Sequence, residues 1–257
     1  MTELLAHLEA LRGSGRKLLV PYLMTGIPDK DSFPEVYRAV AAGADAIEVG
    51  LPFSDPLMDG PVIAAAGERV IRAGIGPLDA LELAGAQQAD PPRIVMTYYN
   101  PIHRIGESEF CRRAADAGTR GLIVPDLPME ESEALRRAAA EVGIAWIPLV
   151  APTSSPERVA AISATATGFV YAVSSLGVTG ARDSLASSAA EVVRRIRVAT
   201  DAPVLIGIGI SDAAQAAAAA MIADGVVVGS AVVRVALEDG AAAAGALVAG
   251  MRVALDG

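Results

Sequence analysis

Short runs of β-branched and aromatic residues alternate with longer alanine-rich segments along the chain, and this alternation limits its possible folds most. Each short run suits one buried strand, and each longer segment has the 3.6-residue apolar spacing of a helix. Regular alternation of the two is typical of βα units around a parallel sheet. The expected strands are KLLVPYLM from Lys17, AIEVG from Ala46, RIVMTYY from Arg93, GLIVP from Gly121, AWIPLV from Ala145, GFVYAV from Gly168, PVLIGIG from Pro203 and GVVVGS from Gly225.

About eight βα units in 257 residues predict an α/β fold, a (β/α)8 TIM barrel of residues 1–257 with an extra N-terminal helix. No proline-rich linker, low-complexity segment or charge run divides the chain, so a single domain is favoured over two. A doubly wound open sheet is the alternative arrangement of the same units. Ser155 and the pair Ser211-Asp212 are expected helix N-caps, and Gly43, Gly118 and Gly143 are expected to end helices.

Composition disfavours several classes of protein. The mean hydropathy of +0.43 owes much to alanine, and no uninterrupted apolar run reaches the roughly 20 residues that a membrane-spanning helix needs. The N-terminal residues fit neither a secretory signal nor a transit peptide, so we expect a cytoplasmic protein. A net charge of −9 disfavours nucleic acid as the main partner. The single Cys111 cannot form an internal disulfide, and no His and Cys cluster has metal-ligand spacing, so no metal site is expected.

Glycines and helix starts coincide where the last three strands of the predicted barrel end. GIGIS (207–211) opens a helix after the seventh strand, and Gly229 with Ser230 opens another after the eighth. The loop after the sixth strand adds Gly177 and Gly180. Glycine lets the backbone approach an anion, and helix N-terminal N–H groups favour negative charge. Each glycine alone is also explained by a turn or a cap, but together they predict a phosphate site.

Glu48 lies within the second predicted strand, where a charged side chain is unusual. A carboxylate that faces the inside of a barrel loses its hydration, and its pKa rises toward the range useful for proton transfer. We therefore expect Glu48 to act as an acid–base group. The alternative is that Glu48 points outward and pairs with an arginine on a helix. Asp55 and Asp59 follow in a loop with three prolines, where Asx turns are the simpler explanation of both.

The segment IEVGLPFSDPLMDGP (47–61) resembles the signature of the tryptophan synthase α subunit family. The resemblance continues in PYLMTGIP, MTYYNPI, GLIVPDLPMEES, YAVSSLGVTGARDS, IGIGIS and DGVVVGSA, and it spans nearly the whole chain in the expected order. It implies a barrel that cleaves indole-3-glycerol phosphate by a retro-aldol reaction to indole and glyceraldehyde 3-phosphate, a lyase of tryptophan biosynthesis. It also implies an αββα complex with a tryptophan synthase β subunit, which would carry pyridoxal phosphate, and no cofactor in this chain.

The same resemblance assigns roles to individual residues. Glu48 would be the acid–base group, Asp59 would interact with the indole nitrogen, and Tyr171 would complete the catalytic set. The implied substrate-binding residues are Tyr22 and Tyr98 around the indole, Thr179 in a closing loop, and Gly180, Gly209, Gly229 and Ser230 at the phosphate. The implied contacts with the β subunit are Asp55, Pro56, Asn100 and Pro101.

The chain departs from the family pattern at a few positions, which concern loop closure and communication with a partner more than the reaction. They are Ala64 and Gly67 after DGP, Ser175 and Leu176 before GVTG, and Ile208 between two glycines. Two other functions stay open: a free-standing indole-3-glycerol-phosphate lyase that releases indole for secondary metabolism, and a barrel without catalysis that serves as an interaction subunit. The presence of Glu48, Asp59 and Tyr171 together argues against the second.

Other reactive side chains have simpler interpretations. His7 and His103 have no carboxylate or serine partner pattern, so surface or packing roles are favoured. Cys111 lies on a predicted helix and is expected to be inert. The acidic residues of DLPMEES (126–132) either favour the N-terminus of the next helix or face the partner that the resemblance implies.

Overall fold

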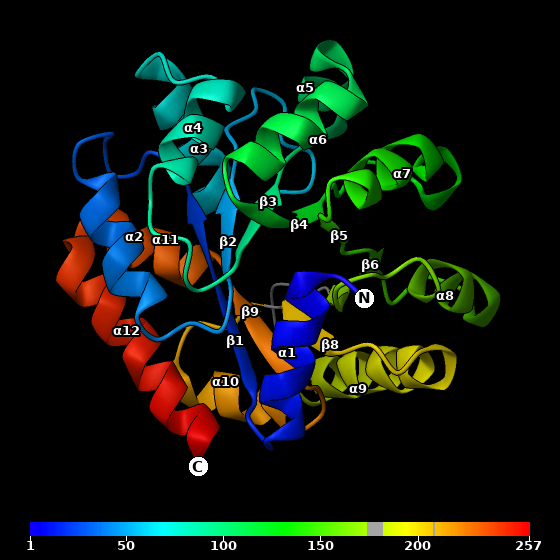
Figure 1. Ribbon diagram of the computed structural model, residues 1–257. Helices are drawn as coiled ribbons and strands as arrows, with labels where there is room; N and C mark the ends of the chain where they lie inside the picture. Colours follow the sequence, from blue (N-terminus) through cyan, green and yellow to red (C-terminus); the bar gives the residue numbers. More distant parts are fainter. Residues whose placement is uncertain (174–181, 208) are drawn as a thin grey trace.

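The computed structural model describes residues 1–173, 182–207 and 209–257. In this part of the chain, nine parallel strands form one sheet in the order β5-β4-β3-β2-β1-β9-β8-β7-β6, and helices surround it (Figure 1). The strands are β1 (Leu18–Met24), β2 (Ile47–Gly50), β3 (Arg93–Met96), β4 (Thr119–Ile123), β5 (Ala145–Trp146), β6 (Leu149–Val150), β7 (Val170–Val173), β8 (Val204–Gly207) and β9 (Gly225–Val228).

The helices follow the predicted alternation, with additional short helices in several of the connections. They are α1 (Glu3–Gly13), α2 (Phe33–Ala41), α3 (Pro61–Arg72), α4 (Pro77–Gly85), α5 (Tyr99–Ile105), α6 (Glu107–Asp116), η1 (Met129–Glu131), α7 (Glu133–Glu141), α8 (Pro156–Ser163), α9 (Arg182–Ala199), α10 (Ala213–Ala220), α11 (Ser230–Glu238) and α12 (Gly240–Asp256). Within the residues that the structure describes, no helix combines the length and apolar character needed to cross a membrane.

The expected helix boundaries are confirmed, and Gly43 follows the end of α2 and its C-cap Ala42. The side chains of Ser155 and Asp212 cap α8 and α10 by accepting hydrogen bonds from backbone N–H groups three residues later. Gly118 and Gly143 follow α6 and α7 with φ of 77°, the left-handed conformation that ends a helix at little cost for glycine.

The fifth predicted strand is divided in two, which is why the sheet has nine strands instead of eight. AWIPLV forms β5 and β6, with Ile147 and Pro148 between them. Pro148 has no N–H to donate, so the regular ladder is interrupted there. Ile147 N still donates to Leu122 O at 3.1 Å, and Pro148 O accepts from Tyr171 N at 3.0 Å. The interrupted strand therefore joins the two ends of the strand order, and the sheet is a (β/α)8 barrel; the open-sheet alternative is wrong.

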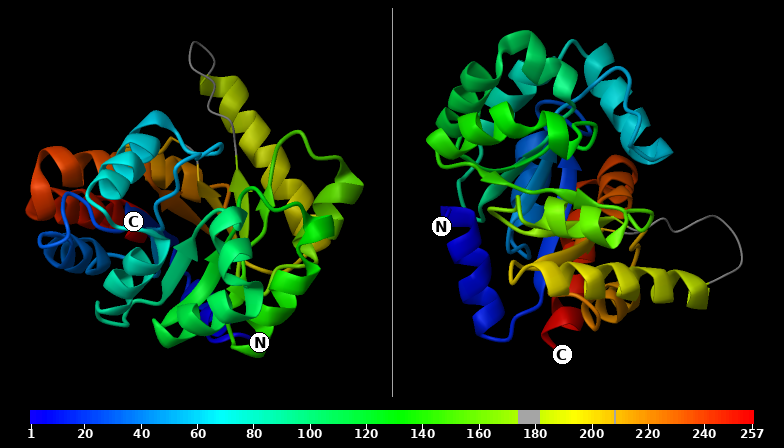
Figure 2. Two further views of the ribbon diagram at one scale, coloured as in Figure 1. Left: turned by 90° about the horizontal axis from the view of Figure 1, so that it is seen from above. Right: turned by 90° about the vertical axis from the view of Figure 1, so that its right-hand side faces the viewer.

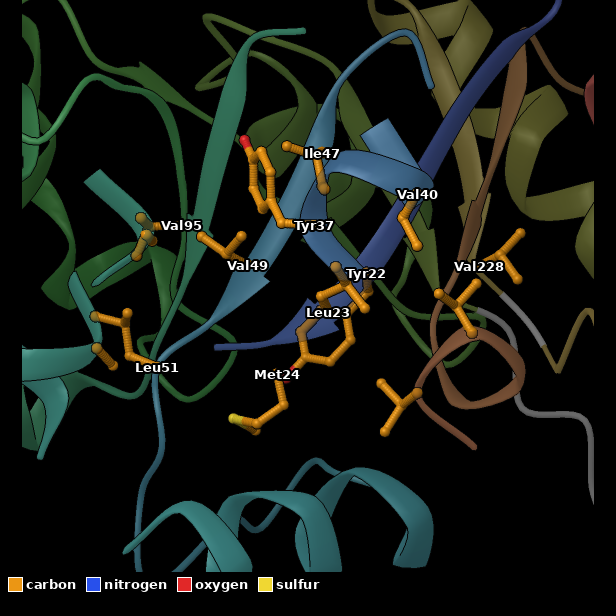
Figure 3. Close-up of a cluster of buried hydrophobic side chains, with 14 of the residues drawn as sticks. Tyr22, Leu23, Met24, Tyr37, Val40, Ile47, Val49, Leu51, Val95 and Val228 are labelled. Atoms are coloured by element: carbon orange, nitrogen blue, oxygen red, sulfur yellow. The ribbon is translucent and has the colours of Figure 1, made fainter. Parts of the chain in front are cut away.

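Alternate residues of each strand face opposite sides of the sheet, and the outward-facing residues of β6, β7 and β8 form a cluster of their own with α8 and α9. Outward-facing side chains such as Leu23, Val49 and Val95 belong to a cluster with Tyr37 and Val40 of α2 (Figure 3). The inward-facing side chains form another cluster inside the barrel, whose members include Leu18, Val20, Ile94, Leu205 and Val227.

The extra N-terminal helix α1 packs on the inner cluster. Leu4 and Leu8 of this helix are fully buried among the inward-facing strand residues. The helix contacts β1, β4 and β5, and Figures 1 and 2 show it apart from the helices that surround the sheet. Because α1 fills the end of the barrel where the strands begin, a cavity inside the barrel has to lie at the other end.

The start of the strand that carries Glu48 is fixed by Asp45. The carboxylate of Asp45 accepts hydrogen bonds from Leu19 N at 2.8 Å, Arg16 Nε at 2.7 Å and Arg252 Nη1 at 2.9 Å. These bonds connect β1, β2 and the C-terminal helix α12 through one buried anion. Two arginines and a backbone N–H compensate its charge, so we interpret Asp45 as a structural anchor.

Candidate active site

Two adjoining cavities lie among the carboxyl ends of the strands. The first, here called the carboxylate cavity, has a volume of about 180 Å³ and is lined by Tyr22, Glu48, Asp59 and Tyr171 together with apolar side chains. The second, here called the glycine cavity, has a volume of about 280 Å³ and is lined by residues 207–211, except 208, and by the start of α11. The cavities share five lining residues: Ile63, Tyr171, Gly207, Val227 and Gly229. A ligand with a polar and an apolar end could therefore extend through both.

Glu48 faces the carboxylate cavity from β2. The residue is 4% exposed, and its Oε2 atom has no hydrogen-bond partner among the described residues. Burial, and secondly the charge of Asp59, raise the pKa of Glu48 to about 8. The alternative that Glu48 points outward to an arginine is wrong, because its side chain lines the cavity inside the barrel. A carboxyl group with this pKa can both release and accept a proton near neutral pH.

Asp59 lies in the loop after β2 and is held there by Tyr98. The Tyr98 hydroxyl donates to Asp59 Oδ1 at 3.0 Å and accepts a hydrogen bond from Met58 N at 3.0 Å. The Tyr98 ring stacks on Phe53 with 5.0 Å between ring centroids. Burial raises the pKa of Asp59, whereas the hydrogen bond from Tyr98 lowers it. Tyr98 thus holds the loop through both its hydroxyl and its ring. Asp59 interacts with a distant side chain, and an Asx turn does not account for this interaction.

The two carboxyl groups have different environments within one cavity. Glu48 lacks a hydrogen bond on Oε2 and its pKa is raised to about 8, so it is mainly protonated at pH 7. Burial raises the pKa of Asp59 as well, but its hydroxyl donor opposes that shift by favouring the ionised form. Neighbouring acids whose environments differ in this way are suited to different tasks, one to proton transfer and one to stabilising positive charge.

Tyr22 and Tyr171 reach the carboxylate cavity from β1 and β7, and each lies over a glycine of a neighbouring strand. A Cβ atom on Gly50 would overlap the Tyr22 hydroxyl, and a Cβ atom on Gly207 would overlap the Tyr171 ring and hydroxyl. Sequence analysis did not identify this requirement, because it depends on which strands are neighbours. Burial raises the pKa of both tyrosines well above the ordinary value, so both hydroxyls stay protonated and able to donate.

The glycine cavity has the features expected of an anion site. Gly209 has φ of 44°, and Gly229 precedes the first residue of α11. No side chain caps the N-terminus of α11, and its first turn carries no acidic residue. The N–H groups at the start of α11 are therefore available to a ligand, and the helix dipole favours an anion there.

Arg234 also lines the glycine cavity and was missed by sequence analysis. It follows Ser230 by four residues on α11, so the two side chains lie on the same face of the helix. Ser230 was already predicted to bind phosphate, so the spacing of four residues between Ser230 and Arg234 was the signal in the sequence that could have identified Arg234. Ser211, which also lines this cavity, is held by Gln215, whose Oε1 accepts a hydrogen bond from Ser211 N at 2.8 Å.

Several expected residues fall outside the part of the chain that the structure describes. These are Thr179 and Gly180 of the predicted substrate site and the departures Ser175, Leu176 and Ile208. Of the predicted partner contacts, Asp55 and Asn100 are exposed, Pro56 is partly exposed, and Pro101 is buried within α5.

Leu57 and Met58 are exposed apolar residues that sequence analysis did not single out. They are 85% and 55% exposed, and they directly precede Asp59 in the loop after β2. A protein that covered this apolar tip would act on the segment that carries the Asp59 carboxylate.

The two histidines and the cysteine considered in the sequence lie outside the two cavities and pack against other parts of the fold. The imidazole of His7 is 2.9 Å from Asp45 O, and His103 lies beside the Tyr99 ring. Cys111 is buried, and burial raises the pKa of its thiol to about 12. Among the described residues, no group of three His, Cys, Asp or Glu side chains is arranged to hold a metal ion.

Comparison with known proteins agrees with the geometry of the two cavities. A family model described as tryptophan synthase alpha chain matches residues 8–251. The tryptophan synthase alpha chain of Carboxydothermus hydrogenoformans is 49% identical over 227 residues, which cover 87% of this chain and 85% of that protein. The corresponding protein of Synechococcus elongatus is 45% identical in an alignment that covers 100% of this chain and 98% of that protein.

Solved structures show the same likeness. A crystal structure of tryptophan synthase subunit alpha from Legionella pneumophila has a TM-score of 0.90 at 33% identity, covering 100% of this chain and 99% of that chain. A chain in a crystal structure of tryptophan synthase from M. tuberculosis has a TM-score of 0.88 at 39% identity, covering 99% and 98%. The chain therefore belongs to the tryptophan synthase alpha chain family, as its sequence motifs predicted.

Proposed function

We propose that the chain is the α subunit of a tryptophan synthase and cleaves indole-3-glycerol phosphate to indole and glyceraldehyde 3-phosphate. The observation that supports this most directly is the pair of differently placed carboxyl groups, Glu48 and Asp59, in one cavity beside an anion site. Apolar side chains complete the walls of the carboxylate cavity, among them Met96, Ile123 and Leu149, and they suit a flat aromatic ring.

Cleavage requires one proton to arrive at C3 of the indole and one to leave the alcohol on the carbon bonded to it. Protonation of C3 places positive charge on the ring nitrogen, and loss of the alcohol proton turns the C–O bond into a carbonyl as the C–C bond breaks. The electron pair of that bond returns to the ring and neutralises the nitrogen. Glu48, protonated at pH 7, can give the first proton and accept the second, so it ends the cycle as it began.

Asp59 and the glycine cavity supply electrostatic stabilisation. An ionised Asp59 beside the indole N–H stabilises the positive charge that develops on the ring nitrogen. The start of α11, Gly209 and Arg234 offer N–H groups and a cation to the phosphate. Because the phosphate takes no part in bond breaking, its binding serves to position the reacting carbon beside Glu48.

The proposal includes a tryptophan synthase β subunit as partner, in an αββα complex whose pyridoxal phosphate lies in the β subunit. No cofactor is assigned to this chain, because every step above uses its own carboxyl groups. The exposed apolar pair Leu57 and Met58, next to Asp59, supports a partner surface that is coupled to the site. A cytoplasmic location, as expected of amino-acid biosynthesis, is part of the same proposal.

The proposed function is tested by measuring indole formed from indole-3-glycerol phosphate, with and without the cognate β subunit. We expect slow turnover by the isolated chain and a rise in kcat of about tenfold with the β subunit, equivalent to roughly 1.4 kcal/mol of bias toward a closed site. High activity that no β subunit changes would identify a free-standing lyase. No indole under either condition would contradict the proposal and favour an interaction subunit.

Tyr98→Phe is expected to change the pH profile of the reaction. The hydroxyl that is removed lowers the pKa of Asp59, so the pKa of this carboxyl should rise in the variant. Asp59 is needed ionised, and therefore the acid limb of kcat/KM should move to higher pH. We also expect kcat/KM at neutral pH to fall about tenfold, since a charged hydrogen bond and an anchor of the loop are lost.

Tyr99→Phe is a matched control for this variant. The Tyr99 hydroxyl donates to Glu107 Oε1 at 2.9 Å, at the surface and away from Asp59. Its loss should leave the acid limb in place. If Tyr98→Phe and Tyr99→Phe gave the same profile as the unmodified chain, the hydrogen bond between Tyr98 and Asp59 would have no part in catalysis.

A further inference from the structure

The hydroxyl of Tyr22 is a buried donor that nothing in the described part of the chain satisfies. Tyr22 is 3% exposed, and its hydroxyl oxygen has no hydrogen-bond partner there. The side chain lines the carboxylate cavity, whose wall also contains the unpartnered Oε2 atom of Glu48. Buried hydroxyls are nearly always hydrogen-bonded in folded proteins, so an unpaired hydroxyl that lines a cavity is a candidate donor to a bound ligand.

The position of this hydroxyl is built into the sheet. Tyr22 and Glu48 are direct partners in the register of β1 and β2, and Met24 is opposite Gly50. The absence of a side chain at Gly50 creates the space into which the Tyr22 hydroxyl extends. Both strands are buried over their whole length, so neither residue can move far. Figure 3 shows Tyr22 in β1 beside the packed side chains of Leu23 and Met24.

The chemistry of the proposed substrate limits what this donor can meet. The indole ring has a donor N–H and no lone-pair acceptor, so it cannot accept in the plane of the ring. The phosphate belongs to the glycine cavity, which Tyr22 does not line. Tyr171 lines both cavities, whereas Tyr22 and Glu48 line the carboxylate cavity alone. Among the atoms of the substrate, the acceptors left for Tyr22 are the two alcohol oxygens of the glycerol chain.

Resting on the proposed function, we infer that the Tyr22 hydroxyl donates a hydrogen bond to the alcohol oxygen on the carbon bonded to the indole, the group that Glu48 deprotonates. As the O–H proton passes to Glu48, negative charge develops on this oxygen until its electron pair forms the carbonyl and the C–C bond breaks. A donor aimed at the oxygen stabilises that charge. Tyr22 is then a catalytic residue. Its hydroxyl stays protonated, because burial and the charges of Asp59 and Glu48 raise its pKa.

Two measurements test this inference. First, Tyr22→Phe should lower kcat about 10- to 100-fold with a smaller change in KM, as expected for a donor used mainly during bond breaking. Second, Tyr22→Phe in the Glu48→Gln background should bind indole-3-glycerol phosphate about fivefold more weakly, while an analogue that lacks the alcohol next to the ring should bind equally well with and without the hydroxyl. Isothermal titration calorimetry at equilibrium measures both ligands.

Tyr37→Phe is the matched control. Tyr37 is another fully buried tyrosine, but its hydroxyl contacts Arg93 Nε at 3.4 Å outside the barrel. The control should leave kcat and both affinities unchanged. Equal weakening of the substrate and the analogue by Tyr22→Phe would overturn the inference and place the hydroxyl on the second alcohol, which the analogue keeps. A shifted acid limb like that of Tyr98→Phe, with no weakening of either ligand, would also overturn it and place the hydroxyl on Asp59. A Glu48→Gln chain that bound neither ligand would instead contradict the proposed function.

Discussion

Glu48→Gln is expected to remove most turnover and to leave the barrel folded. An amide has nearly the size of a carboxyl group and can occupy the same cavity, but it cannot exchange the proton that the reaction moves from oxygen to carbon. General acid–base groups contribute about 10²–10⁴-fold, so kcat should fall by that factor while substrate binding is kept. Steady-state indole formation together with calorimetric binding of indole-3-glycerol phosphate measures the two quantities separately.

The same variant has an expected signature in stability. The pKa of Glu48 is about 8 in the folded chain and near 4.5 when exposed, so the folded state binds the proton more tightly. The stability that this proton gives is complete below about pH 4.5 and is lost as the pH rises through 8. Glutamine does not titrate, so the Glu48→Gln variant does not lose this stability. The melting temperature of the variant, relative to that of the unmodified chain, should therefore rise between about pH 5 and 9. Activity within threefold of the unmodified chain, or a melting difference independent of pH, would contradict the role given to Glu48.

Asp59→Asn is the second change with a large expected effect. The amide can still accept from the Tyr98 hydroxyl, but it has no charge to stabilise the positive indole ring. We expect kcat/KM to fall about 10²–10³-fold, the usual loss when one group that stabilises developing charge is removed. The charge of Asp59 helps to raise the pKa of Glu48. The basic limb of kcat/KM against pH, which reflects deprotonation of Glu48, should therefore also move to lower pH in the variant. The residual activity, measured across the pH range, reports both effects.

Asp116→Asn serves as the control for this change. Asp116 is an exposed carboxylate on α6 that pairs with Arg112, and its loss should alter neither the rate nor the profile. An Asp59→Asn variant with a reduced rate but an unmoved Glu48 limb would mean that the two carboxyl groups are not electrostatically coupled. An unreduced rate would remove Asp59 from the mechanism.

Much of the fold and part of the site could be predicted from the sequence, because strand and helix periods are local. Glu48 stands in a β-branched run and alternates with small residues, which is enough to predict a strand and to make an inward carboxylate reasonable. Gly207 ends a strand, and Gly209 and Gly229 lie between a strand and a helix, so their place at one end of the barrel follows from parallel topology. The resemblance in the motifs then named the family.

Contacts between distant segments could not be predicted in this way. Tyr98 and Asp59 are separated by 39 residues, and their hydrogen bond exists because the loop after β2 folds across the end of β3. The interruption at Pro148 was not predicted from the sequence, and the partners of Ile147 on β4 and of Pro148 on β7 show that the barrel still closes there.

The sequence by itself determined the alternation of strands and helices, the family, and the residue types at the active site, since each of these depends on the order of neighbours along the chain. The tertiary structure decided which of these residues meet. Gly50 and Gly207 provide space for Tyr22 and Tyr171 only because the register of adjacent strands places each glycine two residues beyond the residue that is paired with the tyrosine. Glu48 acquires its raised pKa only because closure of the barrel removes it from water and leaves Asp59 as a neighbouring charge. Register and burial are properties of the assembled sheet, and no local period along the chain contains them.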